Sequence, residues 1–270
     1  MSIRFVRHFL LALQFFTRLP VTGRLAQWVG YSPSMLRASA AHFPGVGWVV
    51  GGLTAGIFAA GLQVLPSLQG SAWVAAGLST AFSALLTGAF HEDGLADTAD
   101  GLGGGQTREQ ALEIMKDSRI GTYGTVALAL ALLIKLGVLV LLAQVGLAWA
   151  VAGIFLAHVT SRLLPLFLIH GMVHAGEAPQ SKSKPLAESI GHVGLGVGLL
   201  WWLASVAVVA LWLPPGALVA GCTCAVLAAS GVAWRLQRRL QGFTGDGLGA
   251  TQQWAEIGVY LGLAMAASPP

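Results

Sequence analysis

Residues 38–90 contain no Asp, Glu, Lys or Arg. Soluble domains carry roughly 25% charged residues, whereas only 10% of these 270 residues are charged and 55% are hydrophobic. A chain so poor in charge cannot cover a water-facing surface, but it suits a lipid-facing one. The 36 glycines agree, because small residues let membrane helices pack closely. The sequence therefore predicts an all-α, polytopic transmembrane bundle that forms a single integral-membrane domain.

The charge-free stretch is long enough for two membrane spans, since one span takes about 20 apolar residues. A turn signal at residues 66–70 separates them. The run at 9–16 is too short to cross and is followed by no small-residue cleavage site, so we expect an N-terminal interfacial or re-entrant helix rather than a signal peptide. About seven spans are expected in all, near residues 45–65, 72–90, 125–144, 147–169, 192–213, 216–234 and 252–267.

The basic residues predict the orientation of these spans. Every Lys and Arg other than Lys135 and Arg162 lies near the N-terminus or in one of three polar segments, at about 91–124, 171–191 and 235–251. With seven spans, all of these segments fall on one side, and the positive-inside rule places that side in the cytoplasm. We therefore interpret the net charge of +4 as a topology signal and expect no nucleic-acid partner. Cys222 and Cys224 lie in an apolar stretch and indicate helix packing.

The first polar segment begins with a cluster of acids, Glu92, Asp93, Asp97 and Asp100, directly after His91. On a helix, Asp93, Asp97 and Asp100 point in directions of about 0°, 40° and −20°, so they share a face. Three carboxylates this close repel one another. Mg²⁺ would relieve the repulsion, because it takes oxygen ligands and binds carboxylates together with waters and substrate phosphates. The cluster predicts a Mg²⁺ site for phosphoryl-transfer chemistry.

Other interpretations of the cluster explain less. A solvated acidic loop accounts neither for the shared face nor for the glycines between the acids. The spacing of an EF-hand is absent. Zinc is disfavoured because His91 is the one nitrogen ligand nearby and no cysteine accompanies it.

Three more features of the polar segments have two interpretations each. The glycine-rich run 101–105 either brings backbone N–H groups close to phosphates or is a flexible linker. Lys116 and Arg119, which follow a short amphipathic helix, either clamp phosphates or mark a surface helix end. Asp246, among glycines at a membrane edge, is either a turn residue or a further metal ligand or substrate contact.

Lys135 and Arg162 lie inside expected spans. Charges are costly in hydrocarbon, so such residues usually face a polar interior or a substrate path. For Arg162 the alternative is that its side chain reaches the interface.

These residues give the sequence a resemblance to the cobalamin synthase family, also called adenosylcobinamide-GDP ribazoletransferase. The match carries specific blocks, D-G-L-A-D-T-x-D-G and D-S-R-x-G-T, in family order along most of the chain. Glu92 departs from the family pattern and is not expected to be a ligand, and residues 176–188 match poorly. The matching pieces are F-F-T-R-L-P at 15–20, F-P-G-V-G at 43–47, residues 91–101, 115–124 and 161–162, and T-G-D at 244–246 with L-G-A at 248–250.

The resemblance implies an inner-membrane enzyme of late vitamin B12 biosynthesis. It would join adenosylcobinamide-GDP to α-ribazole or its 5′-phosphate, release GMP and require Mg²⁺. Membrane lipid and other enzymes of the pathway would be its partners. Asp97 and Asp100 would be catalytic, and we favour Asp100 as the general base. The implied Mg²⁺ ligands are Asp93, Asp97, Asp100 and Asp246. The implied substrate-binding residues are Gly101, Asp117, Ser118, Arg119, Lys135 and Arg162.

Two other function classes remain as alternatives. A CDP-alcohol phosphotransferase should carry D-G-x₂-A-R, but here Asp97 follows Ala96. A cation transporter would more naturally place its acids within the spans, near the bilayer midplane.

Overall fold

The computed structural model describes residues 3–68, 70–175 and 189–267. Over these ranges the chain is helical apart from turns and one isolated β-bridge between His174 and Phe243. The all-α prediction is confirmed. The helices are α1 (Ile3–Phe16), α2 (Gly23–Val29), α3 (Pro33–Ser39), the 3₁₀ turn η1 (Ala40–His42), α4 (Phe43–Val64), α5 (Ser71–Thr87), α6 (Phe90–Gly104), α7 (Arg108–Ile114), α8 (Thr122–Val145), α9 (Leu147–Gly171), α11 (His192–Val209), α12 (Pro215–Leu240) and α13 (Gly245–Ala266).

A helix lies at each of the seven expected spans. In the described ranges, five segments are by themselves long and apolar enough to cross a membrane: Pro33–Val64, α8, α9, α11 and α12. Helix α5 meets this criterion only together with α6, and α13 does not meet it, because Gln252, Gln253 and Glu256 interrupt its apolar sequence. The polytopic membrane bundle is confirmed, and the five or six crossings that length and composition support are roughly consistent with the expected seven.

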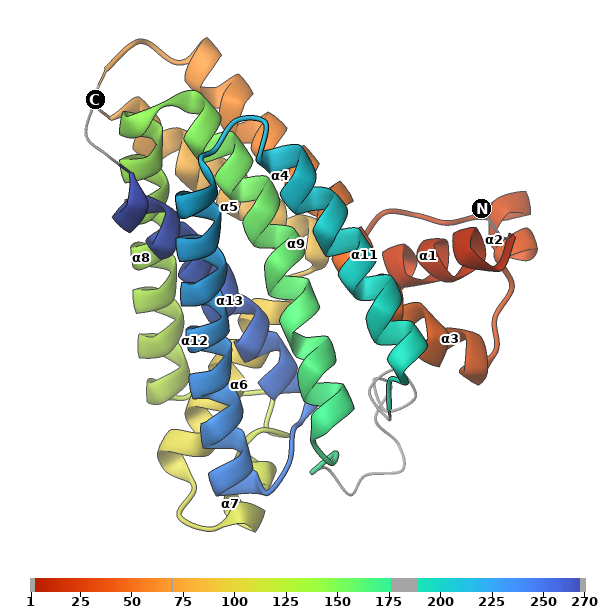
Figure 1. Cartoon of the computed structure of the whole chain (residues 1–270). Coiled ribbons are helices and arrows are strands. Elements are labelled where there is room, and N and C mark those ends of the chain that lie inside the picture. Colours follow the sequence, from red (N-terminus) through yellow and green to blue (C-terminus); the bar gives the residue numbers. More distant parts are fainter. Residues whose placement is uncertain (1–2, 69, 176–188, 268–270) are drawn as a thin grey trace.

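The chain turns sharply between α5 and α6, whose axes differ by 89°. Gly88 and Ala89 both adopt left-handed backbone conformations, with φ of 69° and 56°. A Cβ atom on Gly88 would lie 2.5 Å from Nε of Arg18. The Arg18 side chain therefore packs directly against the backbone of Gly88, in the space that a larger residue would occupy. The turn ends the expected span three residues early and directs α6, most of which belongs to the polar segment 91–124, toward the polar end of the molecule (Figure 1).

Helix α13 runs through the middle of the bundle and packs against α12, α9, α6 and α8 (Figure 1). Its approach to α12 is close because Gly262 has no side chain: a Cβ there would lie 2.3 Å from the carbonyl oxygen of Ala220. A helix surrounded by protein has no need of an apolar surface, which explains why α13 tolerates polar residues in its middle turns.

The three polar segments meet at one end of the bundle, as predicted. Phe243 donates a backbone hydrogen bond to Val173 (2.9 Å) and accepts one from Ala175 (2.8 Å). Arg239 donates to the carbonyl of Leu102 at 3.0 Å. These contacts join segments 91–124 and 235–251 to the start of segment 171–191, of which residues 176–188 lie outside the described ranges. Figure 1 shows the α4–α5, α8–α9 and α11–α12 turns at the opposite end.

Helix α1 forms at the position expected for an N-terminal interfacial helix. It buries one side, with Leu11, Ala12 and Phe16, and contacts α2, α3 and α4 beside the main bundle (Figure 1). Its interfacial or re-entrant placement stays a prediction.

Candidate active site

The acidic cluster lies on a helix, as its spacing predicts. Helix α6 covers all of Asp93, Asp97 and Asp100, so their i, i+4, i+7 spacing directs them to one side. Asp93 is exposed, Asp97 is half-buried and Asp100 is buried. The cluster therefore passes from solvent into the protein along a single helix face.

Helix α13 brings Asp246 to this face. Thr244 caps the helix by accepting a hydrogen bond from the Gly247 N–H at 3.0 Å, which places Asp246 in the first turn. The two helices cross at glycines: a Cβ on Gly94 would lie 2.8 Å from the Asp246 carbonyl oxygen and 3.2 Å from Cα of Gly249. Only glycine at position 94 permits this approach, and it places Asp246 beside the acids of α6.

The electrostatics show that the four acids form one group. The pKa of Asp97 is raised to about 7, first by burial and then by the charges of Asp93, Asp246 and Asp100. The pKa of Asp246 is raised to about 6 by burial and by Asp93. Carboxylates that raise one another's pKa form a site at which a cation is favourable.

These residues suit Mg²⁺ better than a metal held by protein ligands alone. In the described residues, no three His, Cys, Asp or Glu side chains are placed to hold an ion together. Mg²⁺ usually keeps several waters and binds through one or two carboxylates plus substrate phosphates. An oxygen-only group of acids, open at Asp93, has the donor chemistry for this mode of binding.

Asp100 has a more specific contact than its neighbours. Its two oxygens accept backbone hydrogen bonds from Gly121 (2.7 Å) and Gly124 (2.8 Å), at the start of α8. A Cβ on Gly121 or Gly124 would come within 2.4 Å or 2.3 Å of these oxygens. A carboxylate suits the positive end of a helix dipole. Asp100 therefore fixes the start of α8 against α6. Asp97 makes no hydrogen bond to the described residues, so its carboxylate is better placed than that of Asp100 to accept a proton.

The glycine-rich run after the acids is helical rather than a linker. It forms the last turn of α6, to Gly104. Gly101 is a packing position, because a Cβ there would lie 2.6 Å from Cγ of Met115 and 2.8 Å from the Ala111 carbonyl. Close packing of α6 on α7 explains Gly101, and its predicted contact with substrate stays a prediction.

The segment Lys116–Arg119 forms an exposed turn after α7, whose capping box of Thr107 and Gln110 is present. Arg119 donates to both carboxylate oxygens of Asp117, with a shortest distance of 2.6 Å, and this bond lowers the pKa of Asp117 to about 2. Lys116, Ser118 and Arg119 are all open to solvent. The turn is therefore accessible to a phosphate-bearing substrate, but among the described residues no hydrogen bond or ion pair joins it to the acids of α6.

Two arginines that sequence reasoning did not select join the polar segments. Arg239 donates to the carbonyls of Leu102 (3.0 Å) and Gly105 (2.5 Å) at the end of α6. Arg108 donates to the carbonyls of Leu240 and Ala175. The last carbonyl groups of a helix have no hydrogen-bond partner within the helix, so positively charged side chains bind favourably at its C-terminal end. No local sequence signal identifies these long-range bonds.

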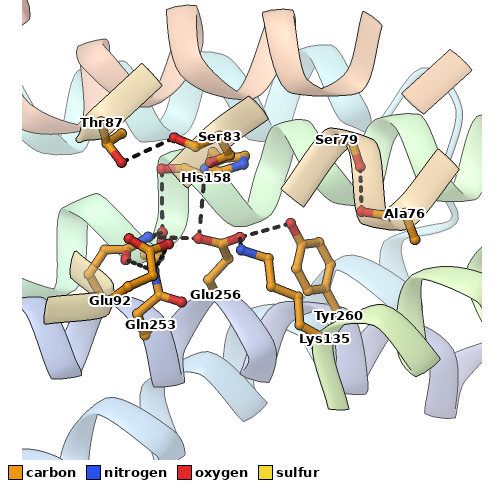
Figure 2. Close-up of polar contacts among 12 residues, drawn as sticks. Ala76, Ser79, Ser83, Thr87, Glu92, Lys135, His158, Gln253, Glu256 and Tyr260 are labelled. Carbon is orange, nitrogen blue, oxygen red and sulfur yellow. Dashed lines mark hydrogen bonds and ion pairs between the residues drawn. The ribbon is translucent and has the colours of Figure 1, made fainter. Parts of the chain in front are cut away.

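Lys135 is buried, as expected, and its partner is Glu256 of α13. The Lys135 Nζ lies 2.5 Å from Glu256 Oε1, and the side chains are 3% and 1% exposed. Tyr260 donates to Oε1 of the same carboxylate (3.1 Å) and Gln252 to Oε2 (2.8 Å) (Figure 2). A charged lysine inside a span is usually paired with an acidic side chain. Glu256, the acid in the last expected span, could therefore have been identified from the sequence as the partner of Lys135.

Arg162 is also buried. It contacts Nδ1 (2.9 Å) and the carbonyl (3.0 Å) of His158, one turn earlier on α9, and stacks over Phe43. Both predictions of interior placement are confirmed, while direct substrate contact by Lys135 and Arg162 stays a prediction.

Glu92 belongs to this interior rather than to the acidic cluster. It is buried and accepts a hydrogen bond from Gln253 at 3.1 Å, and Gln253 also donates to Gln252 (Figure 2). Its assignment as a non-ligand agrees with this placement. The chain of amides connects α6, α13 and α9, because Gln252 also donates to Ser161.

Comparison with known proteins places the whole chain in one family. Residues 8–264 match the model of the family described as cobalamin-5-phosphate synthase. A relative from Albidiferax ferrireducens is 54% identical over 97% of this chain and 99% of its own length. One from Polaromonas naphthalenivorans is 52% identical with the same coverage, and one from Vibrio parahaemolyticus is 43% identical over 94% of this chain and 91% of its own length. All three are named adenosylcobinamide-GDP ribazoletransferase.

No solved structure matches the chain. The family match leaves neither a CDP-alcohol phosphotransferase nor a cation transporter with support. The match covers both the helix that carries Asp93, Asp97 and Asp100 and the helix that carries Asp246, and on this ground the chain belongs to the cobalamin-5-phosphate synthase family, a family of enzymes.

Proposed function

We propose that this enzyme transfers the adenosylcobinamide-phosphate group from adenosylcobinamide-GDP to α-ribazole or α-ribazole-5′-phosphate, releasing GMP. The observation that carries this proposal is the relative that is 54% identical over nearly its full length and bears the name of that activity. The site supplies suitable chemistry, because a diphosphate is an anionic substrate and the acids of α6 and α13 favour a bound cation.

In the proposed reaction, a hydroxyl oxygen of the ribazole ribose attacks the phosphorus attached to the cobinamide. The bond from this phosphorus to the bridging oxygen breaks, and GMP leaves with that oxygen and the bonding electrons. The hydroxyl proton passes to a carboxylate. We assign it to Asp97, which lies on the same face of α6 as Asp93 and Asp100 and makes no hydrogen bond to the described residues. Asp100 holds the start of α8 and positions the neighbouring acids.

Mg²⁺, bound through one or two of the carboxylates of Asp93, Asp97 and Asp246 together with waters and substrate phosphates, would neutralise the diphosphate and the developing charge. Asp246 and Asp93 come from different helices, so ion and substrate both require α6 and α13 to stay in contact at Gly94. The exposed Lys116, Ser118 and Arg119 are available to bind phosphate oxygens of the leaving nucleotide.

We place the polar end of the bundle in the cytoplasm and the protein in the inner membrane. The positive-inside rule supports this, because the turns near Ser67, Val145 and Pro214 at the other end carry no Lys or Arg. Nucleotide substrates and other enzymes of the pathway would then reach the site from the same compartment.

Purified protein in detergent, supplied with adenosylcobinamide-GDP, α-ribazole-5′-phosphate and Mg²⁺, tests the function. We expect stoichiometric release of GMP and formation of the joined product, both abolished by EDTA and restored by excess Mg²⁺. GMP release that proceeds equally without the ribazole acceptor would show a hydrolase instead.

A further inference from the structure

A groove of about 570 Å³ opens between α8 and α12 at the polar end of the bundle. Its residues come from the first turns of α8 and α13, the last turns of α12 and one side of α6. The buried side chains of Leu95 and Ala250 lie at its floor, and exposed side chains of α8 and α12 lie at its rim. Sites for small molecules have volumes of roughly 300–1,000 Å³, so this groove is large enough to hold a ligand.

Below the rim, the walls of the groove are mostly apolar. Leu102 of α6, Val126 of α8 and Val232 of α12 all line it. Such walls favour a hydrocarbon chain, because apolar surface leaves water on both sides of the contact. A sugar or a guanine base would instead leave several donors and acceptors without partners here.

Three further side chains of the groove are typical of the membrane–water interface: Tyr123, Arg235 and Trp254. Tyr123 is 57% exposed, and its ring packs against the α6 backbone, since a Cβ on Gly103 would lie 2.6 Å from Cγ of Tyr123. Tyrosine and tryptophan are enriched at the level of the lipid headgroups. Their presence favours a depth at which phospholipid phosphates reach the rim.

Arg235 is the charged side chain of this rim. It is exposed and makes no hydrogen bond or ion pair within the part of the chain that the structure describes. Its neighbours differ, because Arg239 donates to a carbonyl at the end of α6 and Arg238 stacks over Trp234. A guanidinium binds a phosphate through two parallel hydrogen bonds. The described lining includes no Asp or Glu, so the cation of a zwitterionic headgroup would find no partner there.

Helix α6 separates the groove from the acidic cluster. Measured from Asp93, the other two acids of the shared face point in directions of about 40° and −20°. The groove residues Leu95, Ala99 and Leu102 point in directions of about 200°, 240° and 180°. A molecule in the groove therefore lies behind the acids, on the side of α6 away from the proposed phosphoryl-transfer centre.

A second groove of the bundle shows what distinguishes the first. It has a similar volume, about 610 Å³, and lies between α4, α9 and α11. Trp48, Phe155 and Trp212 line it together with glycine, alanine and valine. Both grooves can take an acyl chain, but the first also presents a guanidinium to the headgroup.

We propose that the groove between α8 and α12 binds an anionic phospholipid. The lipid phosphate pairs with Arg235, and one acyl chain lies along the leucine and valine walls. Charge complementarity selects this occupant, because an unpaired arginine at the headgroup level attracts anionic lipids. The inference goes beyond the proposed function and does not depend on it.

Native mass spectrometry of the purified full chain in detergent tests the headgroup contact. The protein is titrated with phosphatidylglycerol and, separately, with phosphatidylcholine of the same acyl chains. We expect phosphatidylglycerol to bind more tightly by about 5-fold, the effect of one arginine near an anionic lipid. Arg235→Ala should remove the preference, and Arg235→Lys should keep part of it. Arg238→Ala, one turn further along α12, is the matched control and should keep the preference.

Filling the groove tests the contact with the acyl chain. Ala127 is half-buried in the wall formed by α8, so Ala127→Phe adds bulk where the chain would lie. We expect both lipids to bind more weakly by about 10-fold, since overpacking is unfavourable. Ala59→Phe, in the second groove, should leave the preference for phosphatidylglycerol unchanged. Arg235 is on the surface, so its variants keep the proposal testable even where Ala127→Phe does not fold.

Equal affinity of the natural protein for the two lipids, or a preference that survives Arg235→Ala, would overturn the proposal. Inorganic phosphate at the same concentration should not displace phosphatidylglycerol, because the acyl chain contributes to binding. Displacement of the lipid by GDP would show a nucleotide site instead and would also overturn it. These measurements require no turnover, so their outcome is independent of whether the proposed reaction takes place.

Discussion

The acidic residues of the site differ in what they contact. Asp97 makes no hydrogen bond to the described residues and is repelled by Asp93, Asp246 and Asp100. Asp100 accepts two backbone hydrogen bonds and holds the first turn of α8. Spacing alone treats these residues as equivalent, because it reports direction on a helix and not the partner that each carboxylate meets.

Neutralising the acids should remove activity. We expect Asp93→Asn, Asp97→Asn and Asp246→Asn each to lower the rate of GMP release by about 10²-fold or more, since a charge-stabilising contact is lost. Glu113→Gln, at an exposed acid of α7, is the control and should keep the natural rate. A normal rate in Asp246→Asn would remove α13 from the site.

The raised pKa of Asp97 predicts a pH effect on stability in the absence of metal. Because its pKa is raised from 3.8 to about 7, the folded state holds the proton more tightly than the unfolded state. This contribution is lost as pH rises from about 4 through 7. In EDTA, the Tm should be higher at pH 6 than at pH 8, and Asp97→Asn should shrink that difference. A difference that the variant leaves intact would contradict the assignment.

Lys135 and Glu256 form a buried pair whose members depend on each other. Lys135→Met leaves a buried carboxylate without its cation, which should cost about 3 kcal/mol or more of unfolding free energy. The double variant Lys135→Met with Glu256→Met should recover most of this loss. Measurements of unfolding and of protein abundance in membranes check both outcomes, and equal losses in the single and double variants would show that the pair is not coupled.

Among the elements, the crossing of α6 and α13 builds the site. Gly94→Ala would place a methyl group 2.8 Å from the Asp246 carbonyl, whereas Gly77→Ala on α5 meets nothing within 4 Å. Alanine favours a helix over glycine by about 1 kcal/mol, so Gly77→Ala should be neutral or stabilising. Gly94→Ala should lower GMP release by about 10-fold or more. Equal activity in the two variants would show that the crossing tolerates separation.

The sequence predicts elements better than their junctions. The charge-free stretch, the turn signals and the acid spacing placed the helices and the shared face of α6, because these patterns are local. The left-handed pair Gly88–Ala89 and the contact of Gly94 with Asp246 depend on residues far apart in the chain. An apolar sequence is also a poor criterion for a helix such as α13, which other helices surround. Its Gln252, Gln253 and Glu256 are buried and hydrogen-bonded inside the bundle rather than facing lipid.

At the scale of the whole molecule, the bundle has a polar end and an apolar end. In a variant without Cys222 and Cys224, a single cysteine at Gln106 or at Ser67 reports which end faces which compartment. We expect a membrane-impermeant thiol reagent applied to intact cells to label Ser67→Cys and to spare Gln106→Cys until the membrane is opened. The reverse pattern would place the polar end in the periplasm.

The central proposal is that α6 and α13 together form one Mg²⁺-diphosphate centre, and a double-mutant cycle on GMP release tests it most directly. If Asp93 and Asp246 act on one centre, the variant carrying both Asp93→Asn and Asp246→Asn should be little slower than the slower single variant, because effects within one functional unit are not additive. Losses that multiply, so that the double variant is slower by the product of the two single factors, would show that the residues act independently and would contradict a shared centre.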